Sequence, residues 1–405
     1  MKGITIIIIN MNIFLPEQIK KIIKIFEDNN FKCYVVGGAI RDSLLNLTPN
    51  EFDISTNALP CNIKSLFKKV ITIGETYGCI KIFFENTWFE ITTFRIENNY
   101  TDFRHAKFIK FINSPKLDAL RRDFTINSIY FNGKSLIDPF NGIEDLNKKI
   151  IRLIGDKNLK FYEDPLRILR ALKFKSKLNF KIEFLTLLSL KNNFYLIKHL
   201  SKYRIHEELH KIFENLYFYD SIKIFSILNG FQIILNSKFN IFNCEKILKI
   251  TNKFHIRLFC ILYFHSDINK LLIPEILKNH LNFNKTELYE INLIFKILQQ
   301  NLFENNKGFI KFLIFNYDYN STFFILNVLN TYIPSCTDIL NKFFKIKWGY
   351  EPIKIKHLNI QLGKILKNKK NVTKYNKYLI TLVHINPKLN KRDLLIHLLK
   401  NKFKF

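Results

Sequence analysis

The sequence is poor in glycine, proline and tryptophan, which number only 12, 10 and 2 among 405 residues. Asparagine, isoleucine and phenylalanine are abundant instead, a skew that is typical of proteins from A+T-rich genomes. Hydrophobic residues still make up 47% of the chain, so the composition excludes an intrinsically disordered protein. The length suggests two or three domains and is sufficient to bury a core.

The sequence also lacks clustered cysteines and long apolar runs. Its six cysteines are scattered, without a C-x-x-C pair or a tight Cys/His cluster. This pattern indicates a reducing compartment, no disulfides and no structural zinc. The apolar run from Ile4 to Ile9 is shorter than a signal-peptide core, and no run reaches transmembrane length. We therefore expect a soluble, cytoplasmic protein that does not bind membranes.

Acidic residues are scarce: 34 Asp and Glu stand against 63 Lys and Arg, giving a net charge of +29. This excess has two explanations, a polyanionic partner such as nucleic acid or the lysine enrichment of an A+T-rich genome. The segment 351–405 is the most one-sided, with 14 Lys and Arg against Glu351 and Asp393. It either follows a phosphate backbone or forms a solvated helical surface.

Two kinds of hydrophobic pattern divide the chain near residue 150. Before it, apolar spacing and turn residues predict alternating helices and strands; after about residue 160, apolar residues recur at helical spacing nearly to the end. The expected fold is therefore α+β, a mixed sheet followed by an all-helical body. The expected elements are helices at 16–29, 39–46, 60–69, 165–178 and 204–216, strands at 31–36, 51–55, 79–84 and 88–94, a helix end or strand at 123–132, and a loop at 367–377.

Two carboxylates stand two residues apart in 51-EFDIS-55. On a strand, Glu51 and Asp53 would point to the same face, where a divalent cation would relieve their repulsion. Glu90, in an otherwise apolar strand, is a candidate third carboxylate. The alternative is an edge strand whose acidic residues face water.

Three further stretches suggest nucleotide binding. The strand–Gly37–Gly38–helix corner, with Arg41 on the first helical turn, could bind a phosphate. Arg121, Arg122 and Asp123 could hold a triphosphate and ribose, or form a surface ion pair. In 163-EDPLR-167, Asp164 and Arg167 could read the edge of adenine or cytosine, because the carboxylate accepts from the exocyclic amine and the guanidinium donates to ring acceptors. Simple helix capping with an intrahelical ion pair is the alternative there.

Taken in order, these stretches resemble the class II nucleotidyltransferases, which include bacterial tRNA CCA-adding enzymes and poly(A) polymerases. The resemblance covers roughly the first half of the chain. The matching stretches are VVGGAIRD (35–42), EFDIST (51–56), EITTFR (90–95), YTDFRHAKFIKF (100–111), RRDFTINSIYFN (121–132), DPFNGIEDLNKKIIRLIGD (138–156), FYEDPLRILRALKF (161–174) and LSKYRIHEELHKIF (200–213).

The resemblance implies a polymerase-β-like head at 1–155, a helical neck at 156–215, a helical body at 216–350 and a basic tail at 351–405. It implies catalytic roles for Glu51, Asp53 and Glu90, with Mg²⁺ bound by Glu51 and Asp53. The implied nucleotide-binding residues are Gly37, Gly38, Arg41, Asp42, Arg121, Arg122, Asp123, Asn127, Glu163, Asp164, Arg167, Arg170 and Arg204. It also implies a flexible loop with Tyr100, Asp102 and Arg104, and a supporting neck helix with Arg204 and Glu208.

The activity implied is template-independent addition of CMP and AMP to the 3′ end of tRNA, from CTP and ATP, with release of pyrophosphate. A poly(A) polymerase or an A-only adding enzyme is the alternative, because adenine and cytosine satisfy the same Asp/Arg pair. A third possibility, an inactive RNA-binding homologue, arises because the family usually has aspartate where this chain has Glu51.

Overall fold

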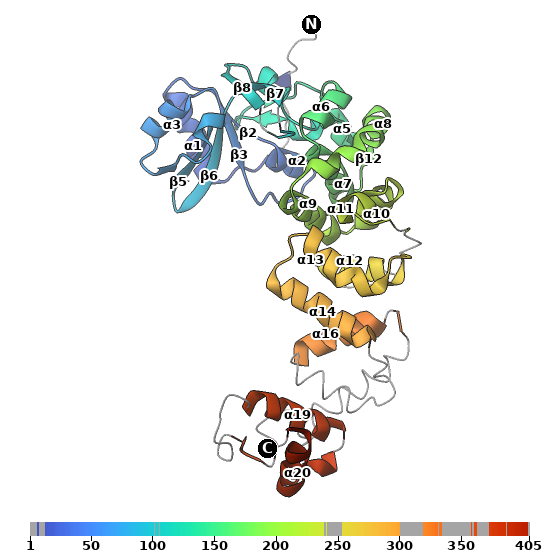
Figure 1. Ribbon diagram of the computed structural model, residues 1–405. Helices are drawn as coiled ribbons and strands as arrows, with labels where there is room; N and C mark the ends of the chain where they lie inside the picture. Colours follow the sequence, from blue (N-terminus) through green and yellow to red (C-terminus); the bar gives the residue numbers. More distant parts are fainter. Residues whose placement is uncertain are drawn as a thin grey trace. The chain divides into compact units, whose positions relative to one another are not determined.

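The computed structural model describes residues 6–7, 13–100, 102–104, 106–238, 240, 253–299, 319–330, 332–333, 358, 360–362, 372–385 and 387–403. The chain divides into two compact units, Met1–Lys238 with Asn279–Asn282, and Phe239–Lys278 with Phe283–Phe405. All strands that the structure describes lie in the first unit, where helices of the same unit follow them along the chain (Figure 1). The expected α+β fold class is confirmed.

An eight-stranded mixed sheet forms the centre of the first 155 residues, in the order β1-β10-β9-β2-β3-β6-β5-β4. Strands β7 and β8 form a separate hairpin, and β11 pairs with β12 in parallel. The strand bounds are β1 Ile6–Ile7, β2 Cys33–Val36, β3 Asp53–Thr56, β4 Val70–Ile71, β5 Cys79–Phe84, β6 Thr87–Thr93, β7 Arg95–Tyr100, β8 Ala106–Phe111, β9 Tyr130–Phe131, β10 Leu136–Ile137, β11 Ile150–Ile151 and β12 Lys181–Ile182.

Helices account for most of the remaining described chain. Those before residue 238 are α1 Glu17–Asp28, α2 Gly38–Leu44, α3 Pro60–Leu66, η1 Glu75–Tyr77, α4 Pro115–Ala119, η2 Thr125–Asn127, α5 Gly142–Asn147, α6 Lys157–Glu163, α7 Leu166–Leu178, α8 Phe184–Asn193, η3 Phe194–His199, α9 Lys202–Glu214, α10 Phe218–Ile227 and α11 Gly230–Leu235. The later ones are α12 Phe254–Phe264, η5 Lys270–Leu272, α13 Ile273–His280, α14 Lys285–Gln299, α16 Tyr319–Asn330, α19 Val372–Ile385, η9 Pro387–Leu389 and α20 Arg392–Phe403.

The register of the central strands decides which polar residues meet. Strand β3 pairs with β2 in antiparallel fashion and with β6 in parallel fashion, and Asp53 is the register partner of Glu90. Strand β2 is buried along its whole length and ends at Gly37, whose positive φ of 82° turns the chain into α2. The turn of α2 and the first residue of β3 therefore lie beside each other at one end of the sheet.

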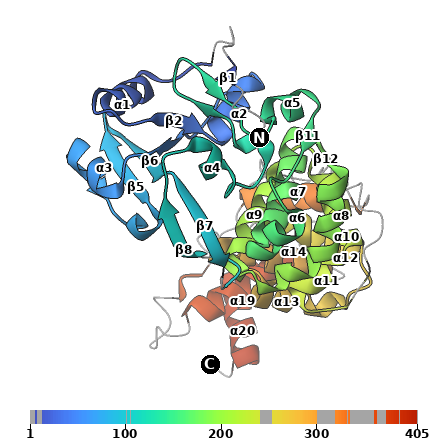
Figure 2. The same cartoon turned by 90° about the horizontal axis from the view of Figure 1, so that it is seen from above.

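Helix α7 is the centre of the helical part of the first unit. Its apolar face is buried, and it packs against α9 and α10, while α6 lies against α8 (Figure 2). Helix α9 likewise buries one face, at Ile205, Leu209 and Ile212. This packing fixes the positions of α7 and α9, and with them the side chains that these two helices direct toward the sheet.

Two expected elements differ from those observed. The strand expected at 51–55 begins only at Asp53, because its register partner Val36 is the last residue of β2 and the chain turns at Gly37. The loop expected at 367–377 is wrong from residue 372 onward, where α19 begins; its Leu379, Ile380 and Val383 join an apolar core, which outweighs the Asn/Lys-rich composition. Residues 367–371 lie outside the described part of the chain.

The stretch 123–132, expected as a helix end or a strand, contains the short helix η2 followed by β9. The four cysteines that the structure describes are free, and Cys33 and Cys260 are buried. None of the described helices combines the length and the apolar character that crossing a membrane requires.

Candidate active site

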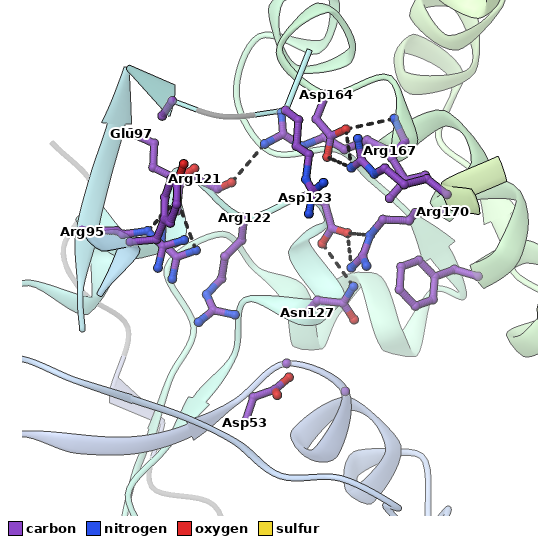
Figure 3. A pocket seen from close by; sticks show the side chains of 18 of the residues that line it. Asp53, Arg95, Glu97, Arg121, Arg122, Asp123, Asn127, Asp164, Arg167 and Arg170 are labelled. Atoms are coloured by element: carbon purple, nitrogen blue, oxygen red, sulfur yellow. Dashed lines mark hydrogen bonds and ion pairs between the residues drawn. The ribbon is translucent and has the colours of Figure 1, made fainter. Parts of the chain in front are cut away.

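A cavity of about 680 Å³ opens between the sheet and helices α7 and α9 (Figure 3). Its charged lining consists of eight arginines and four acidic residues: Arg41, Arg95, Arg104, Arg121, Arg122, Arg167, Arg170 and Arg204, with Asp53, Glu97, Asp123 and Asp164. Because cations outnumber anions two to one, the cavity suits a polyanionic ligand such as a triphosphate.

Eleven of the thirteen predicted nucleotide-binding residues line this cavity, although they come from segments up to 167 positions apart. Figure 3 shows Asp53 at one end of the view and Asp164 and Arg167 at the other, with Arg122 and Asn127 between them. The two predicted residues outside the lining are Asp42 and Glu163, and each contacts an arginine that is part of it.

The three predicted catalytic carboxylates line a neighbouring cavity of about 400 Å³. Asp53 also lines the arginine-rich cavity, whereas Glu51 and Glu90 do not. Glu90 is exposed, and its Oε2 lies 3.6 Å from Lys81 Nζ. Glu51 lies before β3 and not on the strand as expected, but it lines the same cavity as Asp53, the first residue of β3.

Burial of the Asp53 carboxylate raises its pKa, and the negative charges of Glu90 and Glu51 raise it further. The positive charges of Arg122 and Arg170 lower the pKa but do not cancel this rise. A hard divalent cation beside Asp53 would relieve this strain, so the donor chemistry fits Mg²⁺. Among the described residues, no three His, Cys, Asp or Glu side chains are arranged to hold a metal ion. The carboxylates therefore fit a metal whose remaining ligands come from substrate phosphates and water.

The Gly37–Gly38 turn brings bare backbone close to Asp53. A Cβ on Gly37 would lie 3.3 Å from Asp53 Oδ2, and the φ of 82° disfavours any residue with a side chain. Arg41, buried in α2, donates from Nη1 to Asn127 Oδ1 (2.7 Å) and from Nε to Asp42 Oδ1 (2.8 Å). Asp42 in turn accepts from Lys177 Nζ of α7 at 2.9 Å, so it fixes Arg41 from outside the cavity.

Asp123 connects the sheet region to α7. Its Oδ2 accepts from Arg170 at 2.6 Å, and its Oδ1 accepts from Asn127 Nδ2 and from the backbone N–H of Phe124. Burial alone would raise its pKa, but Arg170 and these hydrogen bonds reverse the shift and lower the pKa to about 2. Asp123 is therefore a fixed anion at neutral pH, able to accept hydrogen bonds from a ligand.

The predicted base-reading pair lies where α6 ends and α7 begins. Asp164 and Arg167 both line the cavity, but the two side chains have separate partners. Asp164 Oδ1 accepts from Arg204 Nη2 of α9 at 2.9 Å, and Arg167 Nη1 donates to Glu163 Oε2 at 2.9 Å. Glu163 and Arg204 thus each bind one member of the pair. Of the two α9 residues expected to support the pocket, Arg204 contacts Asp164, whereas Glu208 binds Lys173 at 3.0 Å.

Two charged cavity residues were absent from the predicted residues, Arg95 and Glu97 at the start of β7. Arg95 Nε donates to Glu97 Oε1 at 2.6 Å, and Tyr100 OH donates to Glu97 Oε2. Arg95 ends the EITTFR stretch that carries the resemblance, which was a usable signal, whereas nothing in the sequence distinguishes Glu97. Phe174 of α7 also lines the cavity and was not predicted; its ring centroid lies 5.1 Å from Arg41 Cζ.

The β7–β8 hairpin contains the predicted flexible-loop residues. Its Arg104 lines the cavity, and the neighbouring Phe103 stacks on His199 with 4.5 Å between ring centroids. Phe103 also contacts Tyr162 edge-on at 5.4 Å. In this conformation, aromatic contacts therefore join the hairpin tip to α6 and η3, beside the Asp164 end of the cavity.

Two family models match the first half of the chain: "Poly A polymerase head domain" at residues 33–152 and "Probable RNA and SrmB-binding site of polymerase A" at residues 179–235. The CCA-adding enzyme of Pediococcus pentosaceus is 40% identical over 197 residues, 48% of this chain and 50% of that protein. That of Staphylococcus epidermidis is 38% identical over 219 residues, 54% of this chain and 55% of that protein. The chain thus spans about half the length of the curated relatives it matches.

Solved structures match nearly the whole chain at low identity. The Bacillus stearothermophilus CCA-adding enzyme in complex with CTP aligns with a TM-score of 0.74 and 21% identity, covering 96% of this chain and all of that one. The Thermotoga maritima CCA-adding enzyme complexed with tRNA-CCA aligns with a TM-score of 0.64 and 18% identity, covering 95% and 94%. These likenesses establish a shared fold. In sequence, the first part of the chain resembles the poly(A) polymerase head and the CCA-adding enzymes, and the chain shares the fold of the CCA-adding enzymes.

Proposed function

We propose that this protein adds CMP and AMP, without a template, to the 3′ end of tRNA from CTP and ATP and releases pyrophosphate. The observation that carries the proposal is the arginine-lined cavity, which runs from the Asp164 and Arg167 pair to Asp53. A nucleoside triphosphate laid along it would present its base at one end and its α-phosphate at the other. The similarity to CCA-adding enzymes over the first half of the chain supports this choice.

Each part of the nucleotide would meet a matching group. Asp164 would accept from the exocyclic amine of adenine or cytosine, and Arg167 would donate to the adjacent ring acceptor, whereas uracil and guanine carry a repelling carbonyl there. Asp123, held ionised by Arg170, would accept from the ribose. The guanidinium groups of Arg121 and Arg122 would neutralise the phosphates and the leaving pyrophosphate.

The carboxylates of Asp53 and Glu51 would hold Mg²⁺, with its other ligands from water and substrate phosphates; when bound, the ion lowers the pKa of an attacking hydroxyl and stabilises charge on phosphorus. Glu51 is one methylene longer than the aspartate usual in the family, and the loop that carries it can absorb that length more easily than a paired strand could. Asp53, as the first residue of β3, has less freedom to move.

A second cavity of about 450 Å³ offers an entrance for the RNA. It shares Gly38, Arg41, Asp53 and Phe174 with the first cavity, and Lys173, Lys177 and Lys211 line its outer part. In-line displacement requires the attacking hydroxyl to approach phosphorus opposite the pyrophosphate. A 3′ end that enters past these lysines would reach Asp53 from the side away from the arginine cavity.

Addition of adenosine alone, by a poly(A) polymerase or an A-only adding enzyme, is a second candidate. The observation that favours it is the match of residues 33–152 to a poly(A) polymerase head. The Asp164 and Arg167 pair does not separate the two, because adenine and cytosine present the same donor–acceptor edge.

The test is to incubate the purified protein and Mg²⁺ with tRNA lacking its CCA end and with each triphosphate singly, then with CTP and ATP together. We expect CTP to add two nucleotides and ATP to add one only afterwards. Addition of ATP without a CTP step would support the second candidate. If the wild type binds this tRNA but extends it no more than Asp53→Ala does, the protein is an inactive homologue.

We place the reaction in the cytoplasm.

A further inference from the structure

The carboxylate of Asp118 is completely buried behind the arginine cavity, in the short helix α4. Its Oδ1 accepts from Arg121 Nε at 2.8 Å and from the backbone N–H of Arg95 at 3.1 Å. Its Oδ2 accepts from Tyr130 OH at 2.8 Å and from Arg122 Nε at 3.3 Å. The same Arg122 Nε also donates to Tyr130 OH at 2.9 Å, so Asp118 holds Arg122 both directly and through this hydroxyl. A carboxylate has about four lone-pair positions, and all of them are used here.

These hydrogen bonds orient the side chains of two consecutive arginines, Arg121 and Arg122, toward one carboxylate. Asp118 precedes Arg121 by three residues and Arg122 by four, and it binds the Nε of both. The terminal nitrogens are thereby directed elsewhere: Arg122 Nη2 donates to Ser55 Oγ at 2.9 Å, and Arg121 Nη1 lies 3.9 Å from Glu97. Figure 3 shows Arg122 between Arg121 and Asp53.

The arrangement also reaches both ends of the cavity. Ser55 follows Asp53 by two residues on β3, so Arg122 is tied to the strand that carries the catalytic carboxylate. At the other end, the backbone carbonyl of Arg121 accepts from Arg167 Nη2 at 3.3 Å. A displacement of the two arginines would therefore disturb the phosphate region and the base-reading residue together.

Asp118 further supplies the negative charge that two nearly buried neighbouring guanidiniums need. The side chains of Arg121 and Arg122 are only 14% and 15% exposed, so their mutual repulsion is poorly screened. Burial alone would raise the pKa of Asp118, but Arg121 and Arg122 outweigh burial and lower it. The Asp118 carboxylate is therefore ionised at neutral pH and balances part of the positive charge of the two arginines.

We infer that Asp118 is a positioning residue for the nucleoside triphosphate: it sets the spacing and direction of Arg121 and Arg122 so that both can bind the same phosphate chain. It does not line the cavity, so it acts through the arginines and not by contact with the ligand. This inference rests on the proposed function, since it takes a nucleoside triphosphate as the ligand.

The test variant is Asp118→Asn in the full chain, which keeps the size of the side chain but directs an NH₂ group at hydrogen-bond donors. We expect its Kd for ATP, measured by calorimetry without RNA, to rise at least about tenfold, because charge-assisted hydrogen bonds to both arginines are lost. Its Kd for CCA-less tRNA should stay within about twofold. In extension assays KM for ATP should rise with little change in kcat.

Glu183→Gln is the matched control, because Glu183 is another largely buried carboxylate of the same unit, paired with Arg152 at 3.1 Å and outside the cavity. Tyr130→Phe is the second variant; it preserves the ring packing but removes the hydroxyl that links Asp118 Oδ2 to Arg122 Nε. We expect it to raise the Kd for ATP by at least about threefold. If Asp118→Asn does not fold, this variant decides alone.

An unchanged Kd for ATP in Tyr130→Phe and in folded Asp118→Asn, with a loss of thermal stability like that of the control, overturns the positioning role. A wild type that binds ATP but extends no RNA contradicts the proposed function, while the ATP affinities still decide the role of Asp118. A wild type that does not bind ATP overturns both.

Discussion

The ion pair between Asp123 and Arg170 should make the stability of the first unit depend on pH in a defined acidic range. The pair joins residues 47 positions apart through a 2.6 Å contact, and the Asp123 side chain is only 9% exposed. Its pKa is about 2 in the folded protein, against an ordinary value of 3.8. That difference corresponds to about 2 kcal/mol of folding free energy at neutral pH.

The sign follows from the direction of the shift. Because the folded-state pKa is depressed, the contribution is present above about pH 5 and is lost as the pH falls toward about 2, with roughly half remaining near pH 3. Asp123→Asn should therefore destabilise the protein at pH 7 and should lack this part of the acid-induced loss. The measurement is urea denaturation of the wild type, Asp123→Asn, Arg170→Gln and the double variant at several pH values.

The double-mutant cycle should give a favourable coupling energy on the order of 1–2 kcal/mol at pH 7 that shrinks toward pH 3, because Arg170 is one of several groups that lower the pKa of Asp123. Glu144→Gln provides the contrast, because the Glu144–Lys148 pair is exposed and its loss should hardly change stability. A coupling energy near zero at pH 7, or one that is equal at both pH values, would refute the reasoning.

Three further predictions concern the site. Gly37→Ala should lower extension at least about tenfold with a modest loss of thermal stability, because a Cβ at positive φ would crowd Asp53; unchanged kinetics would contradict this. Arg167→Ala should weaken discrimination between ATP and UTP more than tRNA binding, in parallel single-nucleotide and binding assays. Glu51→Asp should extend RNA at least as fast as the wild type, whereas Asp53→Ala should lose on the order of 10²-fold or more in kcat; a rate for Glu51→Asp well below wild type would show that the longer side chain is required.

Much of the fold could be predicted where one element buries one face. The apolar residues of α1 recur at helical spacing and are buried, and the short apolar run of β2 ends at the predicted glycine turn. The hairpin of β5 and β6 was predictable from its two apolar runs, and its turn residues Glu85 and Asn86 both have positive φ. Prediction failed at 372–377, where packing in a core formed by distant residues overrides an Asn/Lys-rich composition.

The same limit applies to the site. Motifs in a recognisable order predicted thirteen nucleotide-binding residues, and eleven of them line one cavity. The long-range supporting contacts could not be read from the sequence: Asp42 binds Lys177, 135 positions away, and Arg204 binds Asp164, 40 positions away. These partners depend on contacts between elements, for which sequence spacing carries no signal.

The sequence by itself determined which family the first half resembles, the α+β order of elements and the chemical types present at the site. It did so because periodicity fixes which residues share a face of one helix or strand. Only the tertiary structure decided that Glu90 lies opposite Asp53, since strand register joins positions 37 residues apart. It alone showed that Asp118, outside every recognised motif, binds two of the arginines of the cavity, because a buried charge finds its partners through packing.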